Sequence, residues 1–330
     1  MRIAFIEGTV ARTFGSTRRI VELSNSLKAA GHDVTVYTKN GQQPAWIPLF
    51  APVKLWKEIN GTYDLALFNN SKPDELRLVR KTDAKVRAFY ILGWGETRLD
   101  DIEQHIKGGS PDPGIRVIRS VFDDLDFLVL ACSTWIGEHL RERYRKDAEI
   151  LLGGINREHF KAHPKPKDPS SGGTLRIYYS GDPRNRKGTE IVKKAISNVH
   201  FSRRHAALIR RTYWGEGLSQ EQMGRWYSEA TIFADGQLWA GWNNPVLEAM
   251  ACKTPVVCTD IGGVRDFARD GETALLVSPK DYKAMANALM KLVKSPKLRH
   301  DLAENAYEGV SQFTWEKTAK RLVELVEGRL

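Results

Sequence analysis

Short apolar segments alternate with amphipathic segments along the first half of the chain. Buried strands are predicted at the apolar segments, which are Arg2–Ile6, Asp33–Tyr37, Tyr63–Phe68, Val86–Leu92 and Leu125–Ala131. Apolar residues at helical spacing predict helices over about Ser16–Ala30, which Gly31 ends, and over Thr134–Tyr144, which Ser133 caps. Strands that alternate with covering helices are typical of a parallel sheet, so we expect a doubly wound α/β domain.

The same alternation resumes in the second half of the chain. Strands are predicted at Leu175–Tyr179, Ala206–Arg211, Thr231–Ala234, Pro255–Cys258 and Ala274–Val277. The end of the chain is expected to be helical, over Tyr282–Val293, Lys297–Gln312 and Trp315–Glu327. This half is therefore predicted to form a second doubly wound domain.

A segment without apolar periodicity separates the two halves. Residues 156–173 are rich in Pro, Lys, Ser and Gly, a composition typical of linkers. We therefore predict an N-terminal domain over residues 1–155, a linker over 156–173, a C-terminal domain over 174–312 and a last helical segment over 313–330.

The composition narrows the class of protein. The chain has 330 residues, of which 42% are hydrophobic, enough for two cores, so a disordered or fibrous protein is excluded. No apolar run reaches the roughly 20 residues of a membrane helix, and a strand rather than a targeting leader begins the sequence. The expected compartment is the cytoplasm.

The three cysteines lack metal-ligand spacing, so we expect free buried thiols and no metal site at Cys132, Cys252 and Cys258.

The formal net charge of +10 indicates an anionic partner. Basic residues are scattered among 40 acidic ones, and no signature of a nucleic-acid-binding fold is present, so no specific nucleic-acid partner is expected. A nucleotide diphosphate and an anionic membrane surface fit the charge better. The second of these would place the protein at the inner face of the membrane.

The segment from Ala234 to Asp281 carries the strongest candidate chemistry. Its aromatic, Gly- and Asn-rich loop is followed by Pro245, which suits the first turn of a helix, so a helix is predicted to begin at about Asn244. Its open N-terminus could bind hydroxyl or phosphate groups, with Glu248 beside it. The alternative is that Glu248 is only a favourable charge in a first helical turn.

A second candidate element is the basic loop that follows the strand at Tyr178. Arg184, Arg186 and Lys187 precede Gly188 and a predicted helix, so cations and backbone N–H groups could converge on a phosphate there. An exposed basic loop without a ligand is the alternative interpretation.

Further candidates come from a glycine turn and from tryptophans. Gly15 and Ser16 occupy the turn after the first strand, where a glycine allows close approach of the backbone to a ligand. A simple turn that closes the βαβ unit is the alternative. Trp94, Trp239 and Trp242 could stack on sugar faces or fill a core, and the loop composition around Trp94 and Trp242 favours ligand contact.

The segment from Tyr178 to Pro279 resembles glycosyltransferase family 4, the retaining nucleotide-sugar enzymes of the GT-B fold. The family's motif has two glutamates eight positions apart around a Gly-aromatic-Gly-x-Pro loop. Glu248 matches the second glutamate, whereas Ala240 stands at the first and Asn243 at the second loop glycine. Lys187-Gly188 matches the family's diphosphate-binding Lys-Gly pair, but Asp182 stands where an arginine is expected.

The resemblance implies a GT-B fold, with two doubly wound Rossmann-like domains facing a central cleft, the acceptor on the N-terminal side and the donor on the C-terminal side. It also implies that the last helix crosses back to the N-terminal domain. The implied substrate is a UDP-, GDP- or dTDP-sugar, with no cofactor and no metal. Catalytic roles fall to Lys187 and Arg186, and donor contacts to Gly15, Arg184, Arg186, Lys187, Trp242, Asn243, Asn244, Pro245, Val246 and Glu248. Contacts with the sugar or the acceptor fall to Ser16, Trp94, Ala240 and Gly241.

The resemblance therefore predicts a retaining glycosyltransferase that moves a sugar to a glycan, lipid or small-molecule acceptor. Because Ala240 lacks the carboxylate that lies against the transferred sugar, a deoxysugar donor would suit the site, as in bacterial polysaccharide biosynthesis. The main alternative is a nucleotide-sugar-binding protein of the same fold that has lost transfer. A phosphorylase or epimerase and a nucleic-acid-binding module are further alternatives, the last indicated only by the charge.

Overall fold

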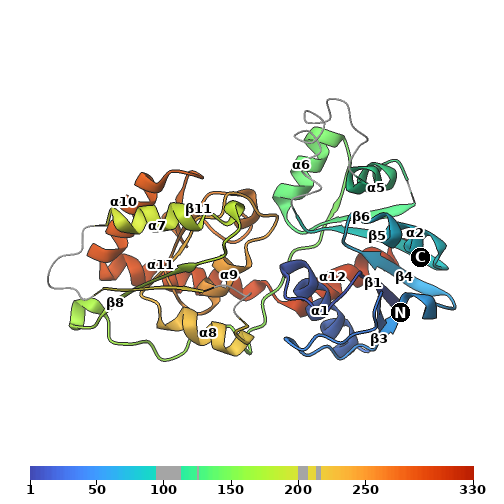
Figure 1. Ribbon diagram of the computed structural model, residues 1–330, viewed down its shortest axis with the longest axis horizontal. Helices are drawn as coiled ribbons and strands as arrows, with labels where there is room; N and C mark the ends of the chain where they lie inside the picture. Colours follow the sequence, from blue (N-terminus) through green and yellow to red (C-terminus); the bar gives the residue numbers. More distant parts are fainter. Residues whose placement is uncertain (94–112, 125, 200–206, 213–216) are drawn as a thin grey trace. The chain divides into compact units, whose positions relative to one another are not determined.

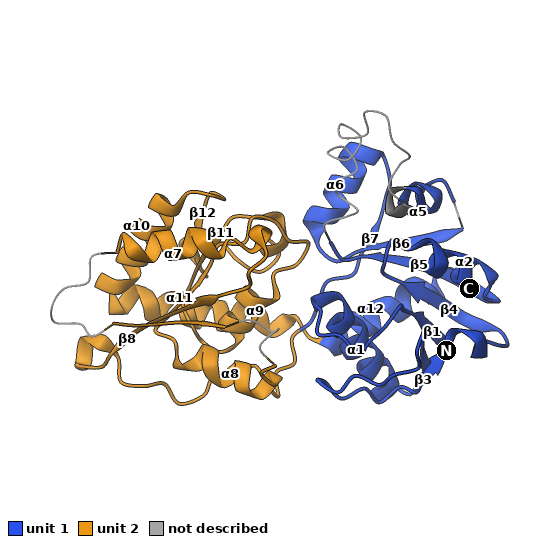
Figure 2. Cartoon of the chain, in the orientation of Figure 1, with its two compact units in different colours: residues 1–154, 315–330 blue, residues 155–314 orange. Residues whose placement is uncertain are grey.

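The computed structural model describes residues 1–93, 113–124, 126–199, 207–212 and 217–330 (Figure 1). The chain divides into two compact units (Figure 2). Unit 1 comprises Met1–Gly154 together with Trp315–Leu330, and unit 2 comprises Ile155–Thr314. Each unit is an α/β structure built on one parallel sheet.

The sheet of unit 1 has the strand order β3-β2-β1-β4-β5-β6-β7. Its strands are β1 (Arg2–Ile6), β2 (Asp33–Thr38), β3 (Val53–Leu55), β4 (Tyr63–Phe68), β5 (Ala84–Ile91), β6 (Phe127–Ala131) and β7 (Glu149–Ile150). The central strands are almost wholly buried, as expected for short apolar runs covered on both faces. Because β1 has β2 on one side and β4 on the other, the strand order reverses between β1 and β4.

The helices of unit 1 are α1 (Gly15–Ala29), α2 (Pro73–Lys81), α5 (Pro113–Phe122), α6 (Thr134–Tyr144) and α12 (Trp315–Glu327). Ser133 caps α6 as predicted, because its hydroxyl accepts a hydrogen bond from the backbone N–H of Ile136 at 3.2 Å. Helix α12 packs beside α1 (Figure 1). The Thr318 hydroxyl also donates to the Leu152 carbonyl oxygen at 2.9 Å, so the end of the chain is part of unit 1.

Unit 2 has a sheet of order β12-β11-β10-β8-β9. Its strands are β8 (Leu175–Ser180), β9 (Ala207–Thr212), β10 (Ile232–Asp235), β11 (Val256–Thr259) and β12 (Leu275–Val277). Its helices are α7 (Thr189–Ser197), α8 (Gln220–Glu229), α9 (Asn244–Ala251), α10 (Tyr282–Lys294) and α11 (Pro296–Gly309). The strand order reverses between β8 and β10, so a crevice for ligands is expected at the carboxyl ends of these two strands.

Two features of unit 2 differ from the sequence prediction. The helix expected over Lys297–Gln312 ends at Gly309, and the 3₁₀ turn η6 (Val310–Gln312) follows it. Helix α8 was not predicted, although Ser219 and Gln222 form a capping box at its start. Its few apolar positions hide the helical period, whereas the capping pattern was readable.

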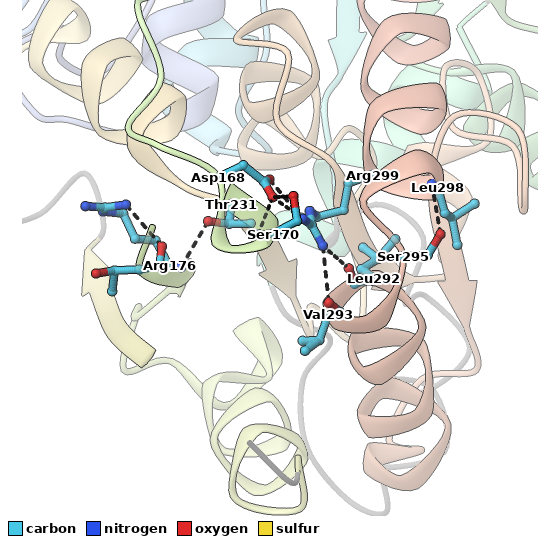
Figure 3. Close-up of polar contacts among 10 residues, drawn as sticks. Asp168, Ser170, Arg176, Thr231, Leu292, Val293, Ser295, Leu298 and Arg299 are labelled. Carbon is cyan, nitrogen blue, oxygen red and sulfur yellow. Dashed lines mark hydrogen bonds and ion pairs between the residues drawn. The ribbon is translucent and has the colours of Figure 1, made fainter. Parts of the chain in front are cut away.

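The segment predicted as a linker is fastened to unit 2 (Figure 3). Asp168 receives two 2.8 Å hydrogen bonds from the Arg299 guanidinium, whose side chain is only 5% exposed. Arg299 also donates to the carbonyl oxygens of Leu292 at 2.6 Å and Val293 at 3.3 Å. These carbonyls belong to the last turn of α10 and have no partner within the helix, so Arg299 caps α10 and holds the segment at once.

The chain enters and leaves unit 2 at neighbouring points. The backbone N–H of Ile155, the first residue of unit 2, donates to the carbonyl oxygen of Phe313 at 3.0 Å. Phe313 lies one residue before the last residue of the unit. The segments by which the chain enters and leaves unit 2 are therefore hydrogen-bonded to each other.

The described residues contain no helix that is both long and apolar enough to span a membrane. The three cysteines are free and buried, as expected.

Candidate functional site

Two loops meet at the carboxyl ends of β8 and β10, where the strand order of unit 2 reverses. The first is the basic loop between Gly181 and Gly188, which contains the 3₁₀ turn η3 (Asn185–Lys187). The second follows Asp235 and leads into α9. Both loops lie where a doubly wound sheet binds its ligand.

The basic loop packs directly on the loop after β10. Gly188 has a φ of 63°, and a Cβ there would lie 1.7 Å from the carbonyl oxygen of Gly236, so no side chain fits. The backbone N–H of Leu238 also donates to the Arg186 carbonyl oxygen at 2.8 Å. The two loops therefore form one continuous surface next to the start of α7.

Lys187 lies in a polar network at this junction. Its ammonium donates to Oε1 of Gln237 at 2.5 Å. Oδ1 of Asp235 accepts hydrogen bonds from the backbone N–H of Gln237 at 3.2 Å and from the Asn243 side chain at 2.9 Å. Burial lowers the pKa of Lys187 to about 8, against the opposing effect of Asp235. Burial also raises the pKa of Asp235.

The two arginines of the basic loop differ in their surroundings. Nε of Arg184 donates to Oδ1 of Asp182 at 2.8 Å, and a second hydrogen bond joins the guanidinium to Oδ2. Burial opposes ionisation of Asp182, but these hydrogen bonds prevail and lower its pKa. Arg184 therefore has an acidic partner, while Arg186 is half-buried and burial lowers its pKa.

Helix α9 begins at Asn244, as predicted, with Pro245 in its first turn. The loop before α9 packs against the 3₁₀ turn η5 (Gly262–Val264). The backbone N–H of Asn243 donates to the Gly263 carbonyl oxygen at 3.0 Å. A Cβ at Gly263 would lie 2.3 Å from the carbonyl oxygen of Ala240, so this contact requires glycine. Asn243 makes no side-chain cap, which leaves the first N–H groups of α9 available to a ligand.

Glu248 is fully buried in α9. The hydroxyl of Tyr227, on α8, donates to its Oε2 at 2.9 Å. Burial, and then the neighbouring carboxylate of Glu248, raise the pKa of Tyr227 well above its usual value of about 10. The tyrosine therefore stays a neutral hydrogen-bond donor, and Glu248 has a fixed partner on the α8 side.

Trp242 occupies a core position. Its indole is 8% exposed and packs edge-to-face on Phe267 and Phe313, with ring centroids 5.0 and 5.7 Å apart. This environment gives the ring a packing role, and its contact with a donor stays a prediction. Of the other donor residues predicted here, Asn244 and Pro245 are half-buried, while Asn243 and Val246 are buried. Ala240 and Gly241, predicted to contact the sugar or the acceptor, are also buried.

The other predicted residues lie elsewhere. Gly15 and Ser16 open α1 in unit 1, where Phe14 provides no side-chain cap for the first N–H groups. Trp94 lies outside the described residues. Arg184, Arg186, Lys187 and residues 240–248 all belong to unit 2, and their contacts with a donor stay predictions.

Three residues of this region, Tyr227, Asp235 and Gln237, were not predicted from the sequence. The available signal was position, because Asp235 and Gln237 follow a buried strand at the carboxyl edge of the sheet. Among the described residues, no group of three or more His, Cys, Asp or Glu side chains could hold a metal ion.

Residues 197–309 match the family described as "Glycosyl transferases group 1". The D-inositol 3-phosphate glycosyltransferase of Rhodococcus erythropolis is 42% identical over 249 residues, which cover 75% of this chain and 52% of that protein. Its namesake from Nocardioides sp. is 35% identical over 108 residues, 33% of this chain and 24% of that protein. The chain thus spans from about a quarter to about half of the length of these relatives.

Solved structures match nearly the whole chain. Sucrose-phosphate synthase from Thermosynechococcus elongatus has a TM-score of 0.78 at 18% identity, covering 99% of this chain and 98% of its own. WaaG, a glycosyltransferase involved in lipopolysaccharide biosynthesis, has a TM-score of 0.70 at 17% identity, covering 99% and 100%. Anabaena Alr3699/HepE in complex with UDP-glucose has a TM-score of 0.72 at 14% identity, also covering 99% and 100%.

The likeness to these structures, together with the two parallel sheets, confirms the predicted GT-B fold. With the match over residues 197–309 and the 42% identity to the Rhodococcus relative, the chain belongs to the glycosyl transferases group 1 family, glycosyltransferase family 4.

Proposed function

We propose that the chain is a glycosyltransferase that moves a sugar from a nucleotide-sugar donor to a hydroxyl of an acceptor, with retention of anomeric configuration. The observation that carries this proposal is the position of Lys187. It lies in the loop after β8, directly before the start of α7. Hydrogen bonds through Gln237 and Asp235 link it to Asn243, the residue before α9. Cations and backbone N–H groups gathered in this way stabilise a diphosphate.

In the proposed reaction, the bond between the anomeric carbon and the diphosphate oxygen breaks as the acceptor hydroxyl attacks the same face of the sugar. The proton of that hydroxyl passes to the departing phosphate. Lys187 and Arg186 stabilise the charge that develops on the diphosphate, assisted by the first N–H groups of α7. Arg184 contributes less, because Asp182 already neutralises its charge.

We assign the nucleotide end of the donor to the region of Glu248. A carboxylate is a suitable partner for the two hydroxyls of a ribose, since each can donate a hydrogen bond to it. Because Glu248 is fully buried in the structure, we propose that the loop before α9 shifts locally when the donor binds. Ala240 offers no polar side chain, so the protein recognises the sugar less strongly at this position.

The names of the relatives suggest substrates to test first. HepE was solved with UDP-glucose, and the sequence relatives are D-inositol 3-phosphate glycosyltransferases. We propose a UDP-sugar as the donor and a phosphorylated polyol, such as an inositol phosphate, as a first acceptor. The net charge of +10 supports an anionic acceptor. The same charge would also favour peripheral contact of the protein with an anionic membrane surface.

A second candidate function is donor binding without transfer. It is favoured by Ala240, at the position of the family's first glutamate, and by the pairing of Arg184 with Asp182. In this case the protein would bind a nucleotide sugar and release it unchanged.

Ligand-linked thermal stabilisation followed by a transfer assay tests both functions. We expect UDP, GDP or dTDP to raise the melting temperature, and the nucleotide that binds most tightly to raise it most. We then expect release of the nucleoside diphosphate only when donor and acceptor are both present, with inositol phosphate compared against unphosphorylated inositol. Binding without release across a panel of donors and acceptors would favour the binding protein, and no binding of any nucleotide would refute both functions.

A further inference from the structure

Asp235 is a buried carboxylate to which the proposed reaction gives no task. It is the last residue of β10 and is only 1% exposed. Its strand is one of the two between which the strand order reverses, so its side chain lies at the ligand-binding edge of the sheet. Burial of a carboxylate is costly unless hydrogen bonds or an opposite charge compensate it.

The hydrogen bonds of Asp235 lead to Lys187. Oδ1 of Asp235 accepts from the backbone N–H of Gln237 and from Nδ2 of Asn243, and the Gln237 side chain in turn receives the ammonium of Lys187. Oδ2 of Asp235 and Oδ1 of Asn243 are buried and have no hydrogen-bond partner among the described residues. Two acceptors without partners beside an ammonium group make this a region of negative potential.

Four charged side chains act on the ammonium of Lys187. Arg184 and Arg186 come from the same loop as Lys187 and repel its positive charge. Asp182, which follows β8, attracts it, but Asp182 is bonded to Arg184. Asp235, from β10, is therefore the main negative charge that is not already paired with a cation. A half-buried lysine beside two arginines would otherwise lose its proton readily.

We propose that Asp235 is a positioning residue for Lys187. It holds the ammonium through Gln237, fixes the loop before α9 through Asn243, and supplies the negative charge that keeps Lys187 protonated for diphosphate binding. The inference rests on the proposed function, because it assumes that Lys187 binds the donor diphosphate. It assigns Asp235 to the donor site without contact with the ligand.

The test is the pH dependence of UDP affinity, measured by calorimetry between about pH 7 and about pH 9.5. In the unmodified protein the affinity is expected to fall as the pH rises through about 8, the pKa of Lys187. Asp235→Asn keeps the size and the hydrogen bonds to Oδ1 but removes the charge, so the fall should begin at lower pH. A drop of one pKa unit makes UDP binding up to about tenfold weaker above pH 8, but only about twofold weaker at pH 7.

Asp260→Asn is the matched control. Asp260 follows the neighbouring strand β11, and its carboxylate pairs with the exposed Arg265 at 2.9 Å. It is not among the charges that shift the pKa of Lys187. This variant should keep the pH profile of the unmodified protein. Lys187→Arg should bind UDP without the fall near pH 8, because a guanidinium keeps its proton there. Thermal unfolding of each variant checks that it folds.

The outcomes separate the inference from the proposed function. If the unmodified protein binds no nucleotide, the proposed function fails and the role of Asp235 fails with it. If it binds UDP but Asp235→Asn leaves the pH profile unchanged, only the inference is wrong. If Asp235→Asn loses the same UDP affinity at every pH, Asp235 has only a structural role. If the fall in UDP affinity near pH 8 persists in Lys187→Arg, the pH dependence belongs to another group. Either result overturns the inference.

Discussion

The hydroxyl of Tyr227 lies 2.9 Å from Oε2 of Glu248, and both side chains are buried. This pair joins α8 to α9 next to the proposed ribose site. Loss of the Tyr227 hydroxyl would take a hydrogen bond away from a buried carboxylate, which costs about 1–3 kcal/mol.

The first prediction concerns this pair. Tyr227→Phe should lower the free energy of unfolding by about 1–3 kcal/mol and reduce the preference for UDP over 2′-deoxy-UDP. Tyr178→Phe is the matched control, because its hydroxyl bonds to Glu229 at 3.3 Å in the same aromatic cluster and does not contact Glu248. Denaturant unfolding and calorimetry measure both quantities. Equal effects of the two variants on the UDP preference would remove Tyr227 from the nucleotide site.

The second prediction concerns Glu248 itself. Glu248→Ala should weaken binding of the nucleotide donor by about 1–3 kcal/mol, the free energy of lost charged hydrogen bonds. Affinities for UDP and 2′-deoxy-UDP should become similar, because the carboxylate is proposed to bind the ribose hydroxyls. The measurement is calorimetry on the folded variant. A variant that folds and binds both nucleotides with unchanged affinity would make Glu248 purely structural.

The third prediction concerns the contact between the two loops of the donor site. Gly188→Ala places a Cβ 1.7 Å from the Gly236 carbonyl oxygen and adds an unfavourable positive φ, so the loops must separate. UDP binding should be lost or strongly reduced. Gly217→Ala is the control, since its φ is 79° but no atom of the described residues lies within 4 Å of the added Cβ. That variant should cost only about 1 kcal/mol of stability and leave UDP binding unchanged. Unchanged UDP affinity in Gly188→Ala would contradict this account of the site.

The fourth prediction concerns the clamp between Asp168 and Arg299. Asp168→Asn leaves the buried Arg299 guanidinium without its anion. We expect the free energy of unfolding to fall by about 1–3 kcal/mol. This is less than for an ion pair in which both side chains are buried, because Asp168 is 43% exposed. Asp301→Asn breaks the exposed pair with Lys297 on the same helix and should cost less than about 0.5 kcal/mol. Urea unfolding measures both variants, and similar losses would mean that the clamp adds no stability.

The fifth prediction concerns pH and two buried carboxyl groups in unit 1. Burial raises the pKa of Glu75 to about 7, and burial together with the charge of Glu75 raises the pKa of Glu7. Both groups bind a proton more tightly in the folded protein. Their contribution to stability is complete below about pH 4.5, where the unfolded chain is also protonated. It is lost as the pH rises to about 7, because the unfolded chain releases its protons first.

Glu75→Gln should therefore flatten the pH dependence of stability. At pH 8 the variant should be more stable than the unmodified protein by on the order of 1–3 kcal/mol, with little difference at pH 4.5. Glu58→Gln is a suitable control, because this carboxylate is exposed and belongs to a short 3₁₀ turn. Melting temperatures across the pH range measure the effect. An unchanged slope in Glu75→Gln would show that the pair does not titrate in this range.

The order of elements was predictable because the strands are short apolar runs between turn residues. The starts of α6 and α9 were predicted to the residue, since Ser133 and Pro245 are strong local signals. Short edge elements such as β3 carry too few residues for a readable period. Helix α2 was missed because its nine residues contain only three apolar side chains in the helix interior, Leu76, Leu78 and Val79, too few to establish a helical period.

The site was less readable than the fold. Lys187 was predicted from the basic loop and from the family pattern, but a lone aspartate at the end of a strand, such as Asp235, looks like an ordinary turn residue. The neighbours of Trp242 indicated a loop, yet its indole is buried by Phe267 and Phe313 from distant parts of the chain. Such burial depends on tertiary contacts, which local composition does not encode. The ion pair of Asp168 with Arg299, 131 residues apart, was hidden for the same reason.

The hydrogen bond between Ile155 and Phe313 brings the two ends of unit 2 together. Unit 2 is therefore topologically an insertion into unit 1, which contributes residues 1–154 before it and 315–330 after it. An insertion with adjacent ends can be exchanged between homologues as one continuous cassette through two neighbouring junctions. Unit 1, by contrast, could be produced alone only if a short bridge joined Gly154 to Trp315.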